Sequence, residues 1–171
     1  MTVALERHGW ILGASEERDI DALMKWFPDR ESVSVWGGPI FRFPFTRHSF
    51  AEDLHWGSMA SFSLRNQAGQ LAAFGQVYKR YDRIHFARLV ANPGMRRQGI
   101  GRRLVEMLMT VSPSIFDCGE YSLFVLRNNK PAYNCYLSVG FEVQEYPDDA
   151  PMADTCYYLT RSVTARPDNN S

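Results

Sequence analysis

Hydrophobic residues recur at helical spacing in four stretches of the chain. In each stretch the apolar positions fall on one face of a helix, and a polar cap, a proline or a glycine marks an end. The predicted helices span residues 16–27 after the N-cap Ser15, residues 47–56 after Thr46, residues 100–111 before Ser112-Pro113, and residues 131–139 before Gly140. Residues 31–45 carry Gly37-Gly38-Pro39 and Pro44, which favour an irregular segment.

Short apolar runs bounded by turn residues predict the strands. They span residues 59–65, 70–78, 84–91, 121–126, 141–145 and 156–162. Neighbouring strands are mostly joined as antiparallel hairpins, whereas a helix separates residues 84–91 from residues 121–126. That crossover places these two strands side by side and parallel. The predicted fold class is therefore α/β with a mixed sheet (α+β), not a doubly wound one.

The composition favours a single packed domain. The chain has 171 residues, of which 45% are hydrophobic and 13% are aromatic, which is enough to build a buried core. We expect one domain over residues 1–165 and a flexible C-terminal tail over residues 166–171.

Charge and cysteine content narrow the function classes. The formal net charge is zero, so the molecule has no overall field to attract nucleic acid or an anionic membrane. No apolar run approaches the ~20 residues of a membrane span, and the N-terminus lacks a secretory signature. Cys118, Cys135 and Cys156 show no metal-ligand spacing and are typical of reduced thiols. We therefore expect a cytoplasmic protein with no metal, no nucleic-acid partner and no membrane partner.

A glycine loop, Arg96 to Gly101, joins a predicted strand to the helix that begins at Ile100. The free N–H groups and the positive dipole end of a helix start form an anion site, and Gly99 would let a phosphate approach the backbone. Gly101 is predicted to permit tight packing at the helix start. A dinucleotide fingerprint would need a third glycine or alanine where Leu104 stands, and a P-loop would need Gly-Lys-Ser/Thr. Since the sequence lacks these residues, a dinucleotide-binding loop and a P-loop are both disfavoured.

Two motifs together identify a family. Arg96 to Gly101 follows Ala91-Asn92-Pro93, and a second pattern places Asn129, Ala132, Tyr136 and Gly140-Phe141 after the next strand. In this combination and order the chain resembles the GNAT superfamily, the acyl-CoA-dependent N-acetyltransferases. The resemblance implies a largely antiparallel central sheet with one splayed parallel strand pair, helices on both faces, and acetyl-CoA as co-substrate.

The resemblance also implies which residues meet the cofactor. The strand that carries residues 89–91 would splay away from residues 122–126 and pair with the amides of the pantetheine arm. Arginines near the loop would offer charge to the phosphates, although Arg103 is expected to be a solvated helix-start residue. The implied cofactor-binding residues are Leu89, Val90, Ala91, Arg96, Arg97, Gln98, Gly99, Ile100, Gly101, Arg102, Asn129 and Tyr136.

Catalysis by direct attack of an amine needs a proton donor and a proton acceptor but no nucleophilic residue, so the cysteines need no role. By family position Tyr136 is the candidate general acid, with core packing as the alternative. Phe124 occupies the place where some members carry a catalytic glutamate, which excludes that version of the mechanism. In other branches the base lies earlier, at the place of His85; the alternative is a polar residue at a strand edge. Strand alternation would put His85, Ala87, Leu89 and Ala91 on one face.

The acceptor is expected to be a small cationic amine. In the family the pocket involves residues 31–56, rich in aromatic side chains that either line a cleft or cover the sheet, and residues 144–155, which are acidic. A peptide or protein amine is the alternative acceptor. An acyl-CoA-binding sensor without turnover is a second function class, and nucleic-acid binding through the arginine cluster is a third. A homodimer is the candidate assembly.

Overall fold

The structure of the protein is a computed structural model that describes residues 4–95 and 98–164. The predictions for Arg96, Arg97 and the tail 166–171 lie outside the described residues. The described strands are β1 (Leu5–Arg7), β2 (Trp10–Ala14), β3 (Ala60–Arg65), β4 (Leu71–Arg80), β5 (Arg83–Ala91), β6 (Glu120–Leu126), β7 (Glu142–Gln144) and β8 (Cys156–Ser162). The described helices are α1 (Glu17–Met24), α2 (Arg30–Gly37), α3 (Arg47–Asp53), α4 (Ile100–Val111), α5 (Lys130–Ser138) and the 3₁₀ turn η1 (Ser112–Ser114).

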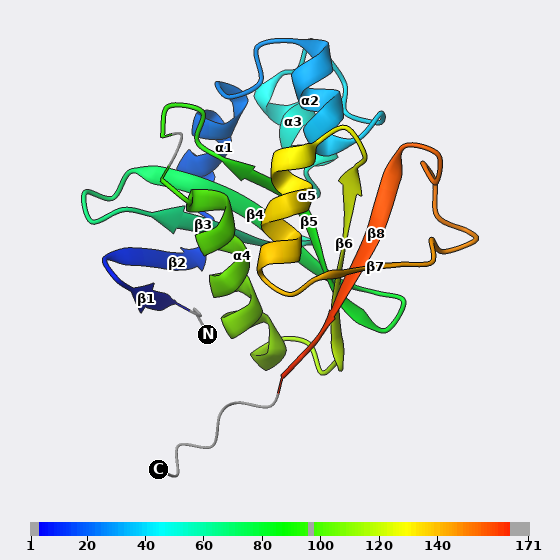
Figure 1. Ribbon diagram of the computed structural model, residues 1–171. Helices are drawn as coiled ribbons and strands as arrows, with labels where there is room; N and C mark the ends of the chain where they lie inside the picture. Colours follow the sequence, from blue (N-terminus) through cyan, green and yellow to red (C-terminus); the bar gives the residue numbers. More distant parts are fainter. Residues whose placement is uncertain (1–3, 96–97, 165–171) are drawn as a thin grey trace.

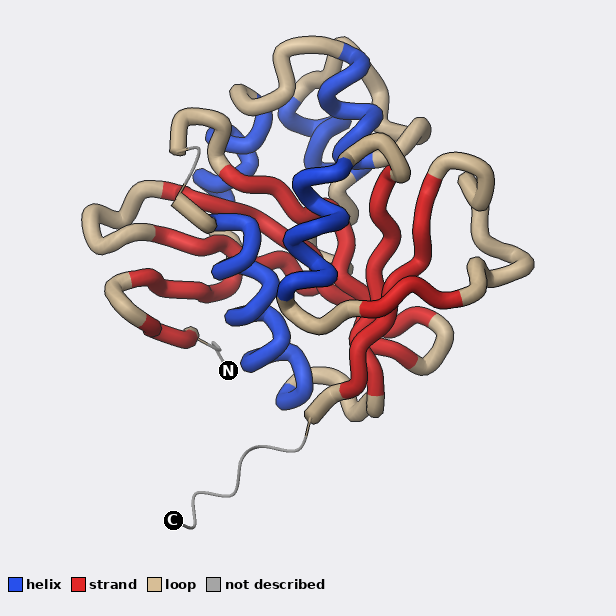
Figure 2. Tube along the Cα trace, viewed as in Figure 1, coloured by secondary structure: helices blue, strands red, loops and turns tan. Residues whose placement is uncertain are grey.

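All strands join one sheet in the order β1-β2-β3-β4-β5-β6-β8-β7. Each neighbouring pair is antiparallel except β5 and β6, which run parallel. The helix α4 connects these two strands in the sequence. The predicted mixed, largely antiparallel sheet with one parallel pair is confirmed. In Figure 1 α4 and α5 lie in front of the sheet, while α1, α2 and α3 gather together beyond its upper part; the tube in Figure 2 shows the same layering.

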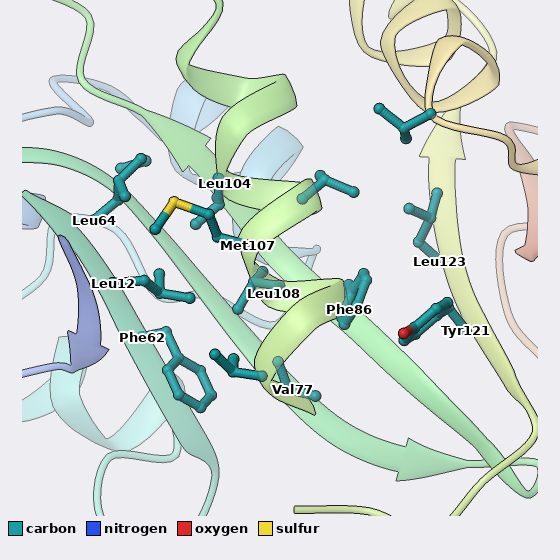
Figure 3. Close-up of a cluster of buried hydrophobic side chains, with 14 of the residues drawn as sticks. Leu12, Phe62, Leu64, Val77, Phe86, Leu104, Met107, Leu108, Tyr121 and Leu123 are labelled. Atoms are coloured by element: carbon teal, nitrogen blue, oxygen red, sulfur yellow. The ribbon is translucent and has the colours of Figure 1, made fainter. Parts of the chain in front are cut away.

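The helix α4 fills the main core. Its buried side chains Leu104, Met107 and Leu108 face Leu12, Leu64 and Val77 from three strands, as Figure 3 shows. The amphipathic spacing of these leucine and methionine residues explains why this segment forms a helix on the sheet. On the side of β6, Phe86 stacks on Tyr121 with ring centroids 5.5 Å apart. The core therefore fixes α4 against the end of β5 that precedes the glycine loop.

A second core, on the other face of the sheet, is aromatic. Trp36 of α2 stacks on Phe27 at 4.3 Å and lies 5.9 Å from the fully buried Phe50 of α3. Phe74 of β4 completes the cluster. Of the two readings left open for residues 31–56, this packing supports the one in which the aromatic side chains cover the sheet.

The structure corrects several element boundaries. The N-terminal hairpin of β1 and β2 was not expected. The predicted irregular segment 31–45 contains α2, which begins at a capping box between Asp29 and Ser32. The first helix begins at Glu17, not Glu16, because Ser15 donates to or accepts from Ser63 Oγ at 2.8 Å and does not cap it. None of the helices in the described part of the chain has the length and apolar composition that crossing a membrane requires.

Candidate active site

The strands β5 and β6 separate along their length. Their ladder pairs Ile84 with Tyr121, His85 with Ser122 and Phe86 with Leu123, and no pair follows. Beyond Phe86, β5 is paired only with β4, and β6 only with β8. From residue 87 onward, one edge of β5 therefore has no strand partner, as the family resemblance implied, although the Arg88 carbonyl accepts a hydrogen bond from the Trp36 indole.

A β-bulge lies in this unpaired stretch. Phe74 of β4 pairs with Val90 and Gln76 pairs with Ala87, so both Arg88 and Leu89 stand opposite Gly75. Arg88 adopts a left-handed backbone conformation with φ of 50°. Because of the extra residue, every later side chain on β5 points to the opposite face of the sheet from the one that strict alternation predicts.

The bulge corrects the predicted alternation. Leu89 and Ala91 pack against the α4 core together with Phe86, and not on the face of His85. Val90 packs on the opposite, aromatic core. The simple two-residue period fails because Arg88 takes up one extra position at the bulge.

One cavity of about 670 Å³ lies beside this stretch, between β5, α4 and α5. Its lining includes every described residue that was predicted to bind the cofactor: Leu89, Val90, Ala91, Gln98, Gly99, Ile100, Gly101, Arg102, Asn129 and Tyr136. Their contact with a ligand stays a prediction. The cavity is further lined by Asn92, Pro93, Met95, Leu104, Val105, Pro131, Ala132 and Cys135, which sequence reasoning had not assigned to binding. Helical spacing from Asn129 and Tyr136 could have indicated Ala132 and Cys135.

The loop that leads into α4 is held by Asn92. Its side chain donates to the Leu71 carbonyl at 2.9 Å and accepts from the Gly94 amide at 2.8 Å. Buried Met95 anchors the loop in the α4 core. Gly99, whose φ of 65° favours glycine, is the N-cap of α4, and no described side chain caps this helix. An uncapped first turn leaves its N–H groups and positive dipole end free for an anion.

The expectation of tight packing at Gly101 is wrong. A Cβ built on this residue meets no atom within 4 Å, so the position faces open space at the cavity wall. Glycine at this position keeps the cavity clear of a side chain, whereas packing within the protein does not require a glycine here.

The arginines of α4 differ in their surroundings. Arg102 lines the cavity, and its Nε donates to Glu106 Oε1 at 2.8 Å, one helical turn away. Arg103 lies instead over the ring of Trp10, with its guanidinium carbon 5.5 Å from the ring centroid. Arg103 is thus away from the cavity, and it packs on β2 instead of standing free in solvent as expected.

The start of α5 brings Asn129 and Tyr136 to the same cavity. Asn129 is the N-cap, and its side chain accepts a hydrogen bond from the Ala132 amide at 3.4 Å. Tyr136 follows two turns later, with its ring 6.3 Å from that of Phe141. Burial raises the pKa of the Tyr136 phenol above its ordinary value. Among the described residues the Tyr136 hydroxyl has no hydrogen-bond partner, and it remains protonated at neutral pH.

His85 lies outside the cavity lining, on the opposite face of β5. It is 2% exposed, and its ring lies between those of Tyr78 at 5.2 Å and Phe124 at 5.0 Å. Burial, with a smaller effect of the Arg80 charge, lowers the pKa of His85 to about 3. His85 therefore does not have a pKa near 6.5, the ordinary histidine value that would suit a base at neutral pH, and its role as the base stays a prediction.

Phe124 belongs to an aromatic cluster on this face. Its ring lies 5.3 Å from Tyr146 and 5.2 Å from Tyr158, and the Arg80 guanidinium lies 5.0 Å from its centroid. The acidic stretch between β7 and β8 reaches the same region, because Asp149 accepts a hydrogen bond from the Tyr81 hydroxyl at 2.7 Å. Within residues 4–95 and 98–164, no group of three or more histidine, cysteine or acidic residues could hold a metal ion.

Comparison with known proteins gives this geometry a context. A family model described as the acetyltransferase (GNAT) family matches residues 21–141. The UPF0039 protein C11D3.02c of Schizosaccharomyces pombe is 32% identical over 80 residues, which cover 46% of this chain and 52% of that protein. The chain thus spans about half the length of this curated relative.

Two solved acetyltransferases share the fold. The spermidine N-acetyltransferase of Vibrio cholerae, in complex with CoA and spermine, is 15% identical with a TM-score of 0.71, covering 91% of this chain and 96% of that one. The ribosomal-protein-S18-alanine N-acetyltransferase of Escherichia coli is 21% identical with a TM-score of 0.63, covering 94% and 97%. At these identities the likeness concerns the fold alone. The family model covers more than half of the sequence, so the resemblance drawn from the two motifs is confirmed: the chain belongs to the acetyltransferase (GNAT) family.

Proposed function

We propose that the protein is an N-acetyltransferase that transfers the acetyl group of acetyl-CoA to a primary amine by direct attack in a ternary complex. The observation that carries this proposal is a single cavity bounded by three features: the unpaired stretch of β5, the uncapped start of α4 and the first turns of α5. Each feature offers a different kind of contact, and together they match the parts of coenzyme A.

The residues present fit that ligand. The first turn of α4, with Gly99 and Gly101 open to the cavity, suits the pyrophosphate. The unpaired edge of β5 offers backbone donors and acceptors to the amides of an extended arm, in the manner of an added strand. Leu89, Ala91 and Ala132 add apolar surface. Acetyl-CoA, when bound there, supplies an acetyl group already activated as a thioester.

Tyr136 is the proposed general acid. Its side chain lines the cavity, and burial keeps its pKa above the ordinary value, so the Oη atom holds a proton at neutral pH. That proton is available to a leaving sulfur at the cavity end of α5. Asn129 is proposed to fix the start of the same helix and to contact the cofactor.

His85 is retained as the proposed general base, acting through water because its ring is buried. A pKa of about 3 keeps the imidazole neutral, which is the form that accepts a proton, but it makes the side chain a weak base. The amine therefore has to arrive largely deprotonated, and the contribution of His85 to the rate is expected to be modest.

The acceptor is proposed to be a small amine. The exposed acidic residues Glu145, Asp148 and Asp154 lie on the loop whose Tyr146 packs on Phe124, and they support an amine that is cationic in solution. A peptide amine is the alternative, and a homodimer remains the proposed assembly. The two solved relatives act, by their names, on a polyamine and on a protein alanine, so the fold accommodates both kinds of acceptor.

The proposal is tested by calorimetry with coenzyme A, followed by incubation with acetyl-CoA and a panel of amines. Release of free thiol and mass spectrometry of the products report turnover. We expect one coenzyme A bound per chain and an acetylated amine. Absence of coenzyme A binding contradicts the proposal, and binding without turnover on any amine supports the sensor instead.

A further inference from the structure

Arg88 is a partly buried cation with no carboxylate within ion-pair distance among the described residues. Its Nη1 donates to Gln76 Oε1 at 2.8 Å and lies 3.6 Å from the Met59 sulfur. Its Nε is buried and has no acceptor in the described part of the protein. Buried donors without partners are costly, and a buried arginine is normally paired. Arg88 therefore has hydrogen-bonding capacity that the protein itself does not use.

The surrounding charges do not neutralise it. The Asp53 carboxylate, whose charge acts on Arg88, is held by Arg42 at 3.0 Å. Arg80, on the same face of the sheet, contacts the Tyr78 hydroxyl and the Phe124 ring, again with no ion pair in the described structure. This face of β4 and β5 is therefore positive where the side chains of Arg80 and Arg88 lie.

The guanidinium of Arg88 is held in place from several sides. Gln76 is fully buried, and its Nε2 donates to the Leu54 carbonyl at 2.7 Å and to Ser61 Oγ at 3.0 Å, which turns its Oε1 toward Arg88. The Trp36 indole donates to the Arg88 carbonyl at 2.8 Å. The guanidinium also lies over the Phe41 ring at 5.6 Å. Such a preorganised donor loses little entropy when it binds a ligand.

Arg88 lies across the strand from the cavity. Leu89, the next residue, lines the cavity on the α4 side, and the bulge sends the Arg88 side chain to the opposite face. Both residues belong to the stretch of β5 that has no β6 partner. If the cavity side holds the acetyl donor, the face of Arg88 is the one left for the acceptor.

We propose that Arg88 binds a carboxylate of the acceptor, so that the substrate is an amine that also carries a carboxylate, of the amino-acid type, and not a purely cationic polyamine. This inference rests on the proposed function and deepens it. A guanidinium matches a carboxylate in geometry and can donate two hydrogen bonds to it. A zwitterionic acceptor also suits the acidic loop, which would face its ammonium group.

The test compares matched amines. Common L-amino acids are each assayed with acetyl-CoA beside their amides and their decarboxylated amines. We expect the carboxylate member of a set to have the higher kcat/KM by roughly tenfold or more, the effect of one charge-assisted hydrogen bond. Equal or lower values for the carboxylate members overturn the inference while leaving the N-acetyltransferase proposal intact.

Substitutions of Arg88 test whether this residue causes the preference for an acceptor with a carboxylate. Arg88→Met is expected to remove the preference through KM of the amine, with KM of acetyl-CoA unchanged, and Arg88→Lys is expected to keep part of it. Arg83→Met is the matched control, because Arg83 lies on the same strand but is already paired with Glu120 at 3.2 Å. Calorimetric titration of the same amino acids into the coenzyme A complex gives a readout independent of turnover. A preference that survives in Arg88→Met contradicts the assignment.

Discussion

His85 Nδ1 lies 2.9 Å from Ser122 Oγ, and these two residues face each other on the parallel ladder of β5 and β6, one pair before its last rung. Both side chains are buried. The hydrogen bond fixes the imidazole between Tyr78 and Phe124, where burial disfavours the charged form. The stability of the β5–β6 ladder, next to the point where the two strands separate, therefore depends on the protonation state of His85.

Acid is expected to destabilise the protein through His85. In the fold the pKa of His85 is lowered to about 3 from its ordinary value of 6.5, so the neutral form is favoured. This stability is present above pH 6.5 and is lost as pH falls toward 3, because the unfolded chain binds the proton first. Between these values the free energy of unfolding should fall by about 1.4 kcal/mol per pH unit from this residue.

Urea unfolding of the wild type and of His85→Gln between pH 7 and pH 4.5 checks this expectation. Gln keeps a polar group near Ser122 but does not titrate, so the variant curve should be flatter by the amount given above. His48→Gln serves as control, because that side chain is 86% exposed. Parallel curves for His85→Gln and the wild type would rule out the buried histidine as the acid-sensitive group.

The local pattern of apolar and polar residues predicts much of the fold, and the elements that it does not predict have physical explanations. The bounds of α4 are those that helical periodicity predicts, because its apolar stripe and its glycine start agree. The helix α2 was missed because Val33, Val35 and the glycines after Trp36 are weak helix formers. Packing of Trp36 on Phe27 and Phe50 overrides that propensity.

The candidate site, like the fold, could be predicted from the sequence only in part. The lining residues predicted to bind the cofactor could be identified before the fold was known, because they lie in or beside two motifs with fixed spacing, whereas lining residues such as Leu104 and Val105 lie outside both motifs and were not assigned. The bulge at Arg88 could not, because its left-handed conformation occurs at an arginine and leaves no glycine or asparagine to mark it. The short β1–β2 hairpin has too few residues for a clear period.

Gly101→Ala is expected to separate stability from binding. Alanine should stabilise α4 by up to about 0.5 kcal/mol, because alanine favours the helix more than glycine does and the new Cβ meets no protein atom. The same methyl group would stand at the cavity wall and should weaken coenzyme A binding by roughly tenfold, the loss of one hydrogen bond to a charged group. Thermal unfolding and calorimetry measure the two effects.

Thr110→Ala is the control for this experiment, since Thr110 is exposed on the same helix and does not line the cavity. It should change stability slightly and leave coenzyme A affinity as it is. Unchanged affinity in Gly101→Ala would show that no ligand group approaches the first turn of α4.

Asp19 is expected to be a major stabilising residue of α1. Its carboxylate is 2% exposed, contacts Arg65 Nη2 at 2.7 Å and accepts from Ser63 Oγ at 2.8 Å, which joins α1 to β3. Asp19→Ala leaves Arg65 with only the longer contact to Glu16 at 3.9 Å and should lower the free energy of unfolding by about 3 kcal/mol. The exposed pair of Asp21 and Arg47 is the matched comparison: Asp21→Ala should cost less than about 1 kcal/mol. Equal losses in the two variants, measured by urea unfolding, would contradict the distinction.

Tyr136→Phe should lower kcat by roughly 100-fold or more at neutral pH, the contribution usual for a positioned general acid. The fold and the affinity for coenzyme A should persist, because the hydroxyl has no hydrogen-bond partner among the described residues and the ring keeps its contact with Phe141. Tyr133→Phe is the control: its ring packs on Tyr157 at 5.1 Å, one helical turn away, and the change should leave turnover within about threefold. Steady-state rates with acetyl-CoA and the best amine decide the matter. Full turnover in Tyr136→Phe would mean that the proton reaches the leaving sulfur from solvent, and Tyr136 would then be a packing residue of α5.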